Sequence, residues 1–167
     1  NDWHKELIAP TTKKLLNLKG DDRLLDIGYG NGLFARRMAK KGIKVTVFDF
    51  SEVNIENAKK YDSDNIDYLT LDASLESDLL KLKNTKYMGL VFNMVFMEIL
   101  DIEHFFSHVK DLLFDKDVFV FSIQYPCFNS WYIENKEDRS LFIKGYINKD
   151  ISTGVAITTQ SVKQFYF

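Results

Sequence analysis

Three of the eight glycines in this 167-residue chain fall within five positions, at Gly28, Gly30 and Gly32, and Asp26 stands just before them. Glycines at a turn between a strand and a helix let the backbone bend tightly and leave room for a ligand. The spacing is G-x-G-x-G, and Leu33 occupies the position at which a dinucleotide-binding fingerprint needs its third glycine. The loop therefore predicts a ligand that contacts the backbone, without choosing between nucleotide classes.

Acidic and amide side chains stand at the ends of the apolar runs that follow. These residues are Asp49, Asp72 and Asn93, and no Lys or Arg lies among them. In an open parallel sheet the ligand lies beyond the carboxyl ends of the strands. A pyrophosphate would meet uncompensated negative charge there, whereas S-adenosylmethionine carries a sulfonium, an ammonium and no phosphate. We expect Asp49 to accept both ribose hydroxyls, and Asp72 to accept the adenine amino group beside the Ala73 N–H. Asp26 would help to hold the loop and the methionine ammonium.

Apolar runs alternate with helical periodicity as far as Gln124. Strands are predicted at 23–27, 45–49, 66–71, 87–92 and 118–123. Helices are predicted between them at 33–41, 51–60, 75–82 and 101–113, and ahead of them at 3–18. This alternation predicts an α/β, Rossmann-like, doubly wound sheet with mostly parallel strands. We expect an N-terminal helical cap over 1–20, a cofactor-binding core over 21–124, and an aromatic-rich segment on the substrate side over 125–167.

Four stretches, in order, resemble motifs of the class I S-adenosylmethionine-dependent methyltransferases, in a branch that acts on small molecules. They are residues 24–32, 45–51, 71–73 and 90–98. The resemblance implies that Tyr29 and Phe50 also contact the cofactor and that Asn93 lies beside its methionine part. It implies methyl transfer to a small-molecule acceptor by in-line displacement, with S-adenosylhomocysteine as the product. Two departures, Tyr29 in place of a small residue or Cys and Glu98 in place of a His, concern the substrate rather than the cofactor.

The core that this resemblance implies has seven strands, and its last two form an antiparallel hairpin. The regular pattern here ends at the fifth strand, so we expect the chain to lack the C-terminal strands and to be truncated after residue 167. We expect the aromatic tail to pair with the sheet, or with a second copy in a homodimer, because an open sheet edge needs cover.

The acceptor side of the site is less defined. The resemblance places His4 near the cofactor mouth, where a neutral imidazole takes a proton from the acceptor, although an exposed histidine at a helix end is the simpler interpretation. The residues expected to shape the acceptor pocket are Trp3, His4, Tyr29, Phe96, Gln124 and Tyr125. His104 and His108 lie one helical turn apart, a spacing that can bind metal. No third ligand is apparent, so we expect a solvated face and no metal.

Composition excludes several other classes. The formal net charge is −2, which gives no strong nucleic-acid signal. The chain has a single cysteine, Cys127, which excludes an internal disulfide framework. The base-binding motifs that accompany the nucleophilic cysteine of cytosine methyltransferases are absent from the sequence. No secretory signal or membrane-spanning stretch is present, so a cytoplasmic protein is expected. Two alternatives stay open: a noncatalytic module that binds S-adenosylmethionine, and an NAD(P)-dependent oxidoreductase.

Overall fold

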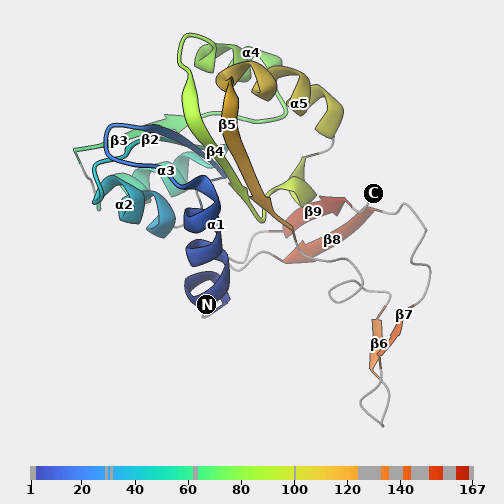
Figure 1. Cartoon of the computed structure of the whole chain (residues 1–167). Coiled ribbons are helices and arrows are strands. Elements are labelled where there is room, and N and C mark those ends of the chain that lie inside the picture. The colour runs from blue at the N-terminus through green and yellow to red at the C-terminus, as the bar shows by residue number, and fades with distance from the viewer. Residues whose placement is uncertain are drawn as a thin grey trace.

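A five-stranded parallel sheet forms the centre of the molecule in the computed structural model (Figure 1). The structure describes residues 3–28, 30, 32–61, 64–99 and 101–123, and the backbone of four later strands. The strands of the sheet are β1 (Arg23–Ile27), β2 (Lys44–Asp49), β3 (Ile66–Thr70), β4 (Tyr87–Asn93) and β5 (Leu113–Ser122). All neighbouring strands are parallel, in the order β3-β2-β1-β4-β5. The predicted doubly wound α/β fold is confirmed.

Helices connect the strands at the predicted places. They are α1 (Ala9–Leu16), α2 (Leu33–Ala39), α3 (Glu52–Lys59), α4 (Glu76–Leu79) and α5 (Ile102–Val109). A π-helical stretch, η1 (His4–Ile8), leads into α1, and short 3₁₀ stretches are η2 (Leu80–Leu82), η3 (Phe96–Glu98) and η4 (Lys110–Leu112). The caps follow the sequence, because the Ser51 side chain accepts from the Asn54 N–H and the Asp101 side chain accepts from the His104 N–H.

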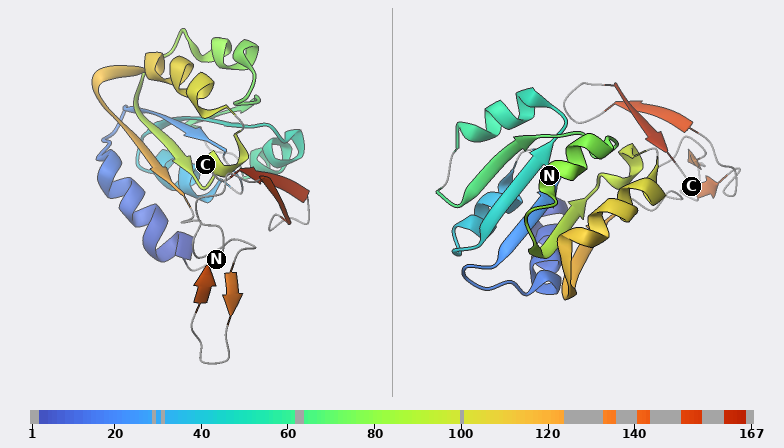
Figure 2. Two further views of the ribbon diagram at one scale, coloured as in Figure 1. Left: turned by 90° about the vertical axis from the view of Figure 1, so that its right-hand side faces the viewer. Right: turned by 90° about the horizontal axis from the view of Figure 1, so that it is seen from above.

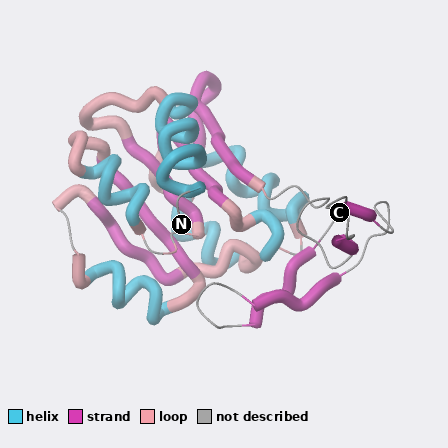
Figure 3. Tube along the Cα trace, turned by 90° about the horizontal axis from the view of Figure 1, so that it is seen from below, coloured by secondary structure: helices cyan, strands magenta, loops and turns pink. Residues whose placement is uncertain are grey.

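The two faces of the sheet are covered by different helices (Figures 2 and 3). Residues of α1, α2 and α3 pack with Leu24, Val47 and Val91 in one core cluster. Residues of α4, α5 and η3 pack with Leu25, Phe48 and other strand residues in the second cluster. Because side chains alternate along a strand, each strand contributes to both cores. The sheet is thus buried on both faces, as parallel sheets are.

One strand boundary differs from its prediction. β5 begins at Leu113, whereas the apolar pattern places its start at 118. Residues 114–116 are exposed, and two of them are charged, so the first half of this edge strand has no apolar run. Its backbone still pairs with β4 through Leu113 and Tyr87, and the register then shifts. An edge strand can carry charge because only part of its surface is covered.

Four strands follow the sheet. They are β6 (Ile133–Asn135), β7 (Leu141–Ile143), β8 (Ile151–Val155) and β9 (Ser161–Phe165). β6 pairs with β7 and β8 pairs with β9, both antiparallel, and β9 lies beside η3. In the part of the chain that the structure describes, the tail does not pair with the sheet, because its strands satisfy each other's hydrogen bonds in hairpins. Pairing with a second copy stays a prediction.

Candidate functional site

The glycine loop between β1 and α2 adopts a backbone that favours glycine. Gly28, Gly30 and Gly32 have φ angles of 70°, 53° and 68°, a region that other residues rarely occupy. A Cβ at Gly28 would come within 2.3 Å of Val95 Cγ2, so this glycine is required for packing against the turn after β4. A Cβ at Gly30 would meet only the Gly28 carbonyl oxygen at 4.0 Å, so a ligand can approach this part of the loop.

Asp49 ties the glycine loop to the start of α3. It is the last residue of β2 and only 6% of its surface is exposed. Its Oδ2 accepts from the Gly30 N–H at 3.2 Å, and its Oδ1 accepts from the Ser51 N–H at 2.9 Å and from Asn54 Nδ2 at 3.4 Å. A carboxylate offers about four acceptor positions, so three protein donors use most of them. A ligand with two hydroxyls would therefore replace part of this network.

Polar residues at the ends of three strands share one face of the sheet. Asp26 follows Leu24 by two positions, Asp49 follows Val47, and Asn93 follows Val91. Leu24, Val47 and Val91 belong to the core cluster under α1 and α2. Since residues two apart in a strand point to the same side, the three polar residues also face α1, α2 and the glycine loop. The structure thus gathers three of the predicted site residues at one edge.

Asp26 is buried, and no described cation contributes to the shift of its pKa. Only 5% of its surface is exposed, and desolvation raises the pKa of its carboxyl group to about 8. In the described part of the chain, no hydrogen bond to this carboxyl group is found. Burial raises the pKa of Glu98, at the end of η3, and the negative charge of Asp49 raises it further. Carboxyl groups with strongly shifted pKa values are typical of functional sites.

Asn93 connects the site to the N-terminal helix. Its Oδ1 accepts from the Ser122 hydroxyl at 3.0 Å and from the Thr12 hydroxyl at 3.3 Å. Thr12 is one of three buried polar or charged residues among the described ones, and it shares a face of α1 with Ala9 and Leu16. The two hydroxyls occupy the carbonyl oxygen of Asn93, so its amide group is oriented as a donor. The predicted helical cap therefore contributes to the site.

Asp72 and Ala73 lie beyond the end of β3. The Asp72 Oδ1 accepts from the Ser74 N–H at 2.8 Å, and the Asp72 N–H donates to Asp78 Oδ2 at 2.9 Å. One carboxylate oxygen of Asp72 therefore holds a local turn. Both residues are half-buried, and the described hydrogen bonds do not join them to Asp26, Asp49 or the glycine loop. Their contact with adenine stays a prediction.

The aromatic residues assigned to the site separate into two groups. Phe50 and Trp3 are exposed by 60% and 70%, so both rings are open to a ligand. Phe96 is not, because only 7% of it is exposed and it packs on Phe92 at a ring distance of 4.3 Å. Its ring neighbours include the buried Phe105 and the exposed Phe106 and Phe121, and its place in the acceptor pocket stays a prediction. Among the remaining predicted contacts, those outside the described residues are Tyr29, Gln124 and Tyr125.

His4 is half-buried in η1. Burial lowers the pKa of its imidazole, and the positive charge of Arg37 lowers it further. Its ring is thus held neutral at neutral pH, which is the state that accepts a proton. The predicted role as proton acceptor is compatible with this electrostatic setting.

Two residues of the site were not predicted as such. Thr12 follows from the i, i+3, i+7 spacing of Ala9, Thr12 and Leu16, which places a hydroxyl on the buried face of α1. The approach of Glu98 to Asp49 has no local signal, because it depends on how η3 folds back against the sheet.

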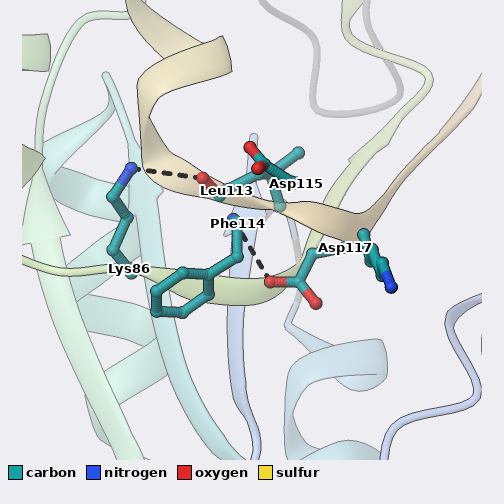
Figure 4. A pocket seen from close by; sticks show the side chains of 6 residues that line it. Lys86, Leu113, Phe114, Asp115 and Asp117 are labelled. Carbon is teal, nitrogen blue, oxygen red and sulfur yellow. Dashed lines mark hydrogen bonds between the residues drawn. The ribbon is translucent and has the colours of Figure 1, made fainter.

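A hollow lies at the opposite end of the strands from the glycine loop. Its lining residues are Lys86, Leu113, Phe114, Asp115, Lys116 and Asp117 (Figure 4). The Lys86 ammonium donates to the Leu113 carbonyl at 3.2 Å and also to the Asp111 carbonyl. The hollow lies where β5 begins, whereas the glycine loop and Asp49 lie at the carboxyl ends of their strands. The hollow is therefore separate from the glycine loop and Asp49.

A search of the described helices found none that is both long enough and apolar enough to cross a membrane.

Relatives and solved structures share this architecture. A ubiquinone biosynthesis O-methyltransferase of Pelagibacter ubique (strain HTCC1062) is 36% identical over 107 residues, which are 64% of this chain and 42% of that protein. The chain thus spans about two fifths of this curated relative. An S-adenosylmethionine-dependent methyltransferase from Mesorhizobium loti has the same fold, with a TM-score of 0.75 and 20% identity over 95% of this chain and 73% of the other. A protein from Listeria monocytogenes assigned to the same class gives a TM-score of 0.74 and 20% identity over 96% and 76%.

The family model described as "Methyltransferase domain" matches residues 2–146. This match covers the glycine loop, the sheet and every predicted cofactor residue, and it confirms the class I methyltransferase resemblance. With a match over most of its length, the chain belongs to the methyltransferase domain family.

Proposed function

We propose that this chain binds S-adenosylmethionine at the carboxyl edge of the sheet and transfers its methyl group to a small-molecule acceptor. The observation that carries the proposal is the hydrogen bond between Asp49 and the glycine loop. The Gly30 N–H donates to a buried strand-end carboxylate in a site that also holds Asp26 and Glu98. Family membership supports the reaction class.

The donor set fits a cationic cofactor. Asp26, Asp49 and Glu98 bring three carboxyl groups to one region, and burial raises the pKa values of Asp26 and Glu98. A positively charged ligand would offset the cost of ionising these buried carboxyl groups, whereas a pyrophosphate would increase that cost. The acidic setting thus favours S-adenosylmethionine over NAD(P), as the strand-end residues predict.

The residues of the chain would divide the work of binding. Asp49 would accept from the ribose hydroxyls in exchange for part of its own network, while the open side of Gly30 admits the ligand. The Asn93 amide, oriented by the Thr12 and Ser122 hydroxyls, would donate to the methionine part. The exposed Phe50 ring offers a surface for the adenosine.

Little catalytic machinery is needed for this reaction. The bound cofactor supplies a methyl group on a positively charged sulfur, so the protein has mainly to align the acceptor and exclude water. The neutral His4 imidazole would take the proton of a hydroxyl acceptor. A hydroxyl is the first acceptor class to test, because the curated relative is an O-methyltransferase.

The test is calorimetric titration of the wild-type chain and two matched variants with S-adenosylmethionine. Asp49→Asn removes the charge from the buried strand-end carboxylate, and Asp67→Asn removes one from an exposed position of the neighbouring strand. Hydrogen bonds to a charged group contribute about 1.5–3 kcal/mol, so Asp49→Asn should weaken binding by roughly 10- to 100-fold. Asp67→Asn should leave the affinity unchanged.

Two results would overturn the proposal. One is a folded wild-type chain that binds neither S-adenosylmethionine nor S-adenosylhomocysteine. The other is equal affinity of the two Asn variants, which would place the ligand away from Asp49. Binding without methyl transfer to any compound in a cell extract would instead select the noncatalytic module that the sequence leaves open.

A further inference from the structure

Two histidines and a glutamate from different helices meet on the face of the molecule that α4 and α5 cover. The Nε2 of His108 lies 3.2 Å from Oε1 of Glu76, and the rings of His104 and His108 are 4.6 Å apart between centroids. One potential ligand atom from each of the three residues lies within 4.8 Å of the others. The sequence analysis found no third ligand for the histidine pair. That expectation is corrected, because Glu76 stands 32 residues before His108 and only the packing of α4 beside α5 brings it there.

His108 is already oriented as a metal ligand. Its Nδ1 lies 3.0 Å from the His104 carbonyl oxygen and 3.0 Å from the Ser107 hydroxyl. With Nδ1 donating to these oxygens, Nε2 holds Glu76 at 3.2 Å through its own proton, and a metal ion would replace that proton. Metal-binding histidines characteristically donate their second ring N–H to a backbone carbonyl or a carboxylate, which fixes the tautomer and the ring direction.

The simpler account is an ion pair between His108 and Glu76. It explains the 3.2 Å contact, but it gives no role to His104. Among the described residues, neither ring nitrogen of His104 makes a hydrogen bond, although its imidazole lies against that of His108. An ion also has to tolerate Lys83, whose positive charge acts on His108. Glu76 offsets this charge at closer range.

We propose that Glu76, His104 and His108 form a Zn²⁺ site that links the first turn of α4 to α5, with water completing the coordination. Two imidazoles and one carboxylate are a ligand set that zinc accepts with one position left open. Zinc bonds of about 2.0–2.2 Å require the three ligand atoms to lie roughly 3.4 Å apart, so the side chains must close slightly from the present geometry. The side chain of Glu76 is 60% exposed and is free of packing that would oppose this movement.

The site has a structural reason to exist. α4 has only four residues, Glu76–Leu79, and a single helical turn is unstable without tertiary support. Leu79 anchors its far end in the core, whereas Glu76 at its first position is exposed. A metal held by Glu76 and α5 would fix that first position.

The test is titration of chelator-stripped chain with Zn²⁺ at pH 8, where protons compete least for His108. We expect one ion per chain, and a visible absorption band of tetrahedral type when Co²⁺ replaces Zn²⁺. His104→Ala and His108→Ala should each abolish both signals, and Glu76→Gln should weaken the affinity at least tenfold.

Two matched variants serve as controls. Glu103→Gln removes an exposed carboxylate from the same helix, and His4→Gln removes the third histidine of the sequence. Neither should change the zinc affinity. Zinc should raise the thermal unfolding midpoint of the wild type and leave that of His104→Ala unchanged. Absence of stoichiometric binding, or unchanged affinity in His104→Ala, would reduce the cluster to an ion pair and overturn the proposal. Loss of binding in His4→Gln would overturn it as well.

Discussion

The buried carboxyl group of Asp26 has a cost in stability that depends on pH. Its burial raises its pKa to about 8, so the native chain keeps a proton that the unfolded chain releases near the ordinary value of 3.8. Since the native state binds more protons between these two values, stability falls as the pH rises through this window. In the middle of the window the slope is about 1.4 kcal/mol per pH unit.

Asp26→Asn should remove this slope, because the amide has nearly the same shape and does not ionise. The variant should gain stability relative to the wild type with each step from pH 5 to 6 and 7. Urea unfolding at these three values measures the difference, in which the contributions of the histidines cancel. Asp67→Asn, at an exposed position, is the control and should give a constant difference. A constant difference for Asp26→Asn would show that the buried carboxyl is already ionised.

At this scale the sequence predicts some site residues and misses others for a physical reason. Asp26 and Asp49 are recognisable because they end apolar runs next to a glycine loop, and parallel strands bring such ends together. Thr12 and Glu98 reach the site through contacts with residues far along the chain. Local periodicity carries no information about such distant partners. For the same reason the sequence does not bring Glu76 together with His104 and His108.

At the scale of elements, the turn between β1 and α2 requires Gly28 for two reasons, its backbone conformation and its packing. An alanine there would adopt a φ of 70°, and its Cβ would meet Val95 Cγ2 at 2.3 Å. A left-handed backbone costs a non-glycine residue about 1–2 kcal/mol, and forcing extra volume into packed structure costs about 1–3 kcal/mol. Gly28→Ala should therefore lower the free energy of unfolding by roughly 2–5 kcal/mol.

Gly20→Ala provides the comparison, because a Cβ at Gly20 meets no atom within 4 Å. It should change the stability very little. Urea unfolding of both variants measures the difference, and calorimetry shows whether Gly28→Ala also weakens the ligand. Equal stabilities would mean that the turn and Val95 rearrange freely.

The strands were predicted to different accuracy along the sheet. β1 to β4 lie within one residue of their predicted bounds, because buried parallel strands are nearly continuous apolar runs. The start of β5 was predicted five residues too late, since its first half is an exposed edge with charged residues. α4 was predicted too long because a leucine-rich stretch continues as a 3₁₀ turn. The hairpins after β5 lack a periodic signal in the sequence.

At the scale of the whole molecule, the proposed ligand contacts residues from β1, β2, β4 and their loops, and through Asn93 it is linked to α1. Binding to such a distributed site stabilises the folded chain as a unit, by about 2.7 kcal/mol at a ligand concentration 100 times Kd. For a chain of this size, the thermal midpoint should rise by roughly 5–10 °C for that free energy. Both S-adenosylmethionine and S-adenosylhomocysteine should produce this shift, and NADH should not.

Thermal unfolding followed by circular dichroism in the presence of a chelator measures these shifts without any contribution from zinc at the α4–α5 cluster. Asp49→Asn should lose most of the shift, because the carboxylate joins the glycine loop to α3 and is the proposed anchor of the ribose. A shift with NADH and none with S-adenosylmethionine would select the oxidoreductase alternative. It would also require a pyrophosphate to bind beside the buried carboxyl groups of Asp26 and Glu98, where its charge would add to the cost of ionising them.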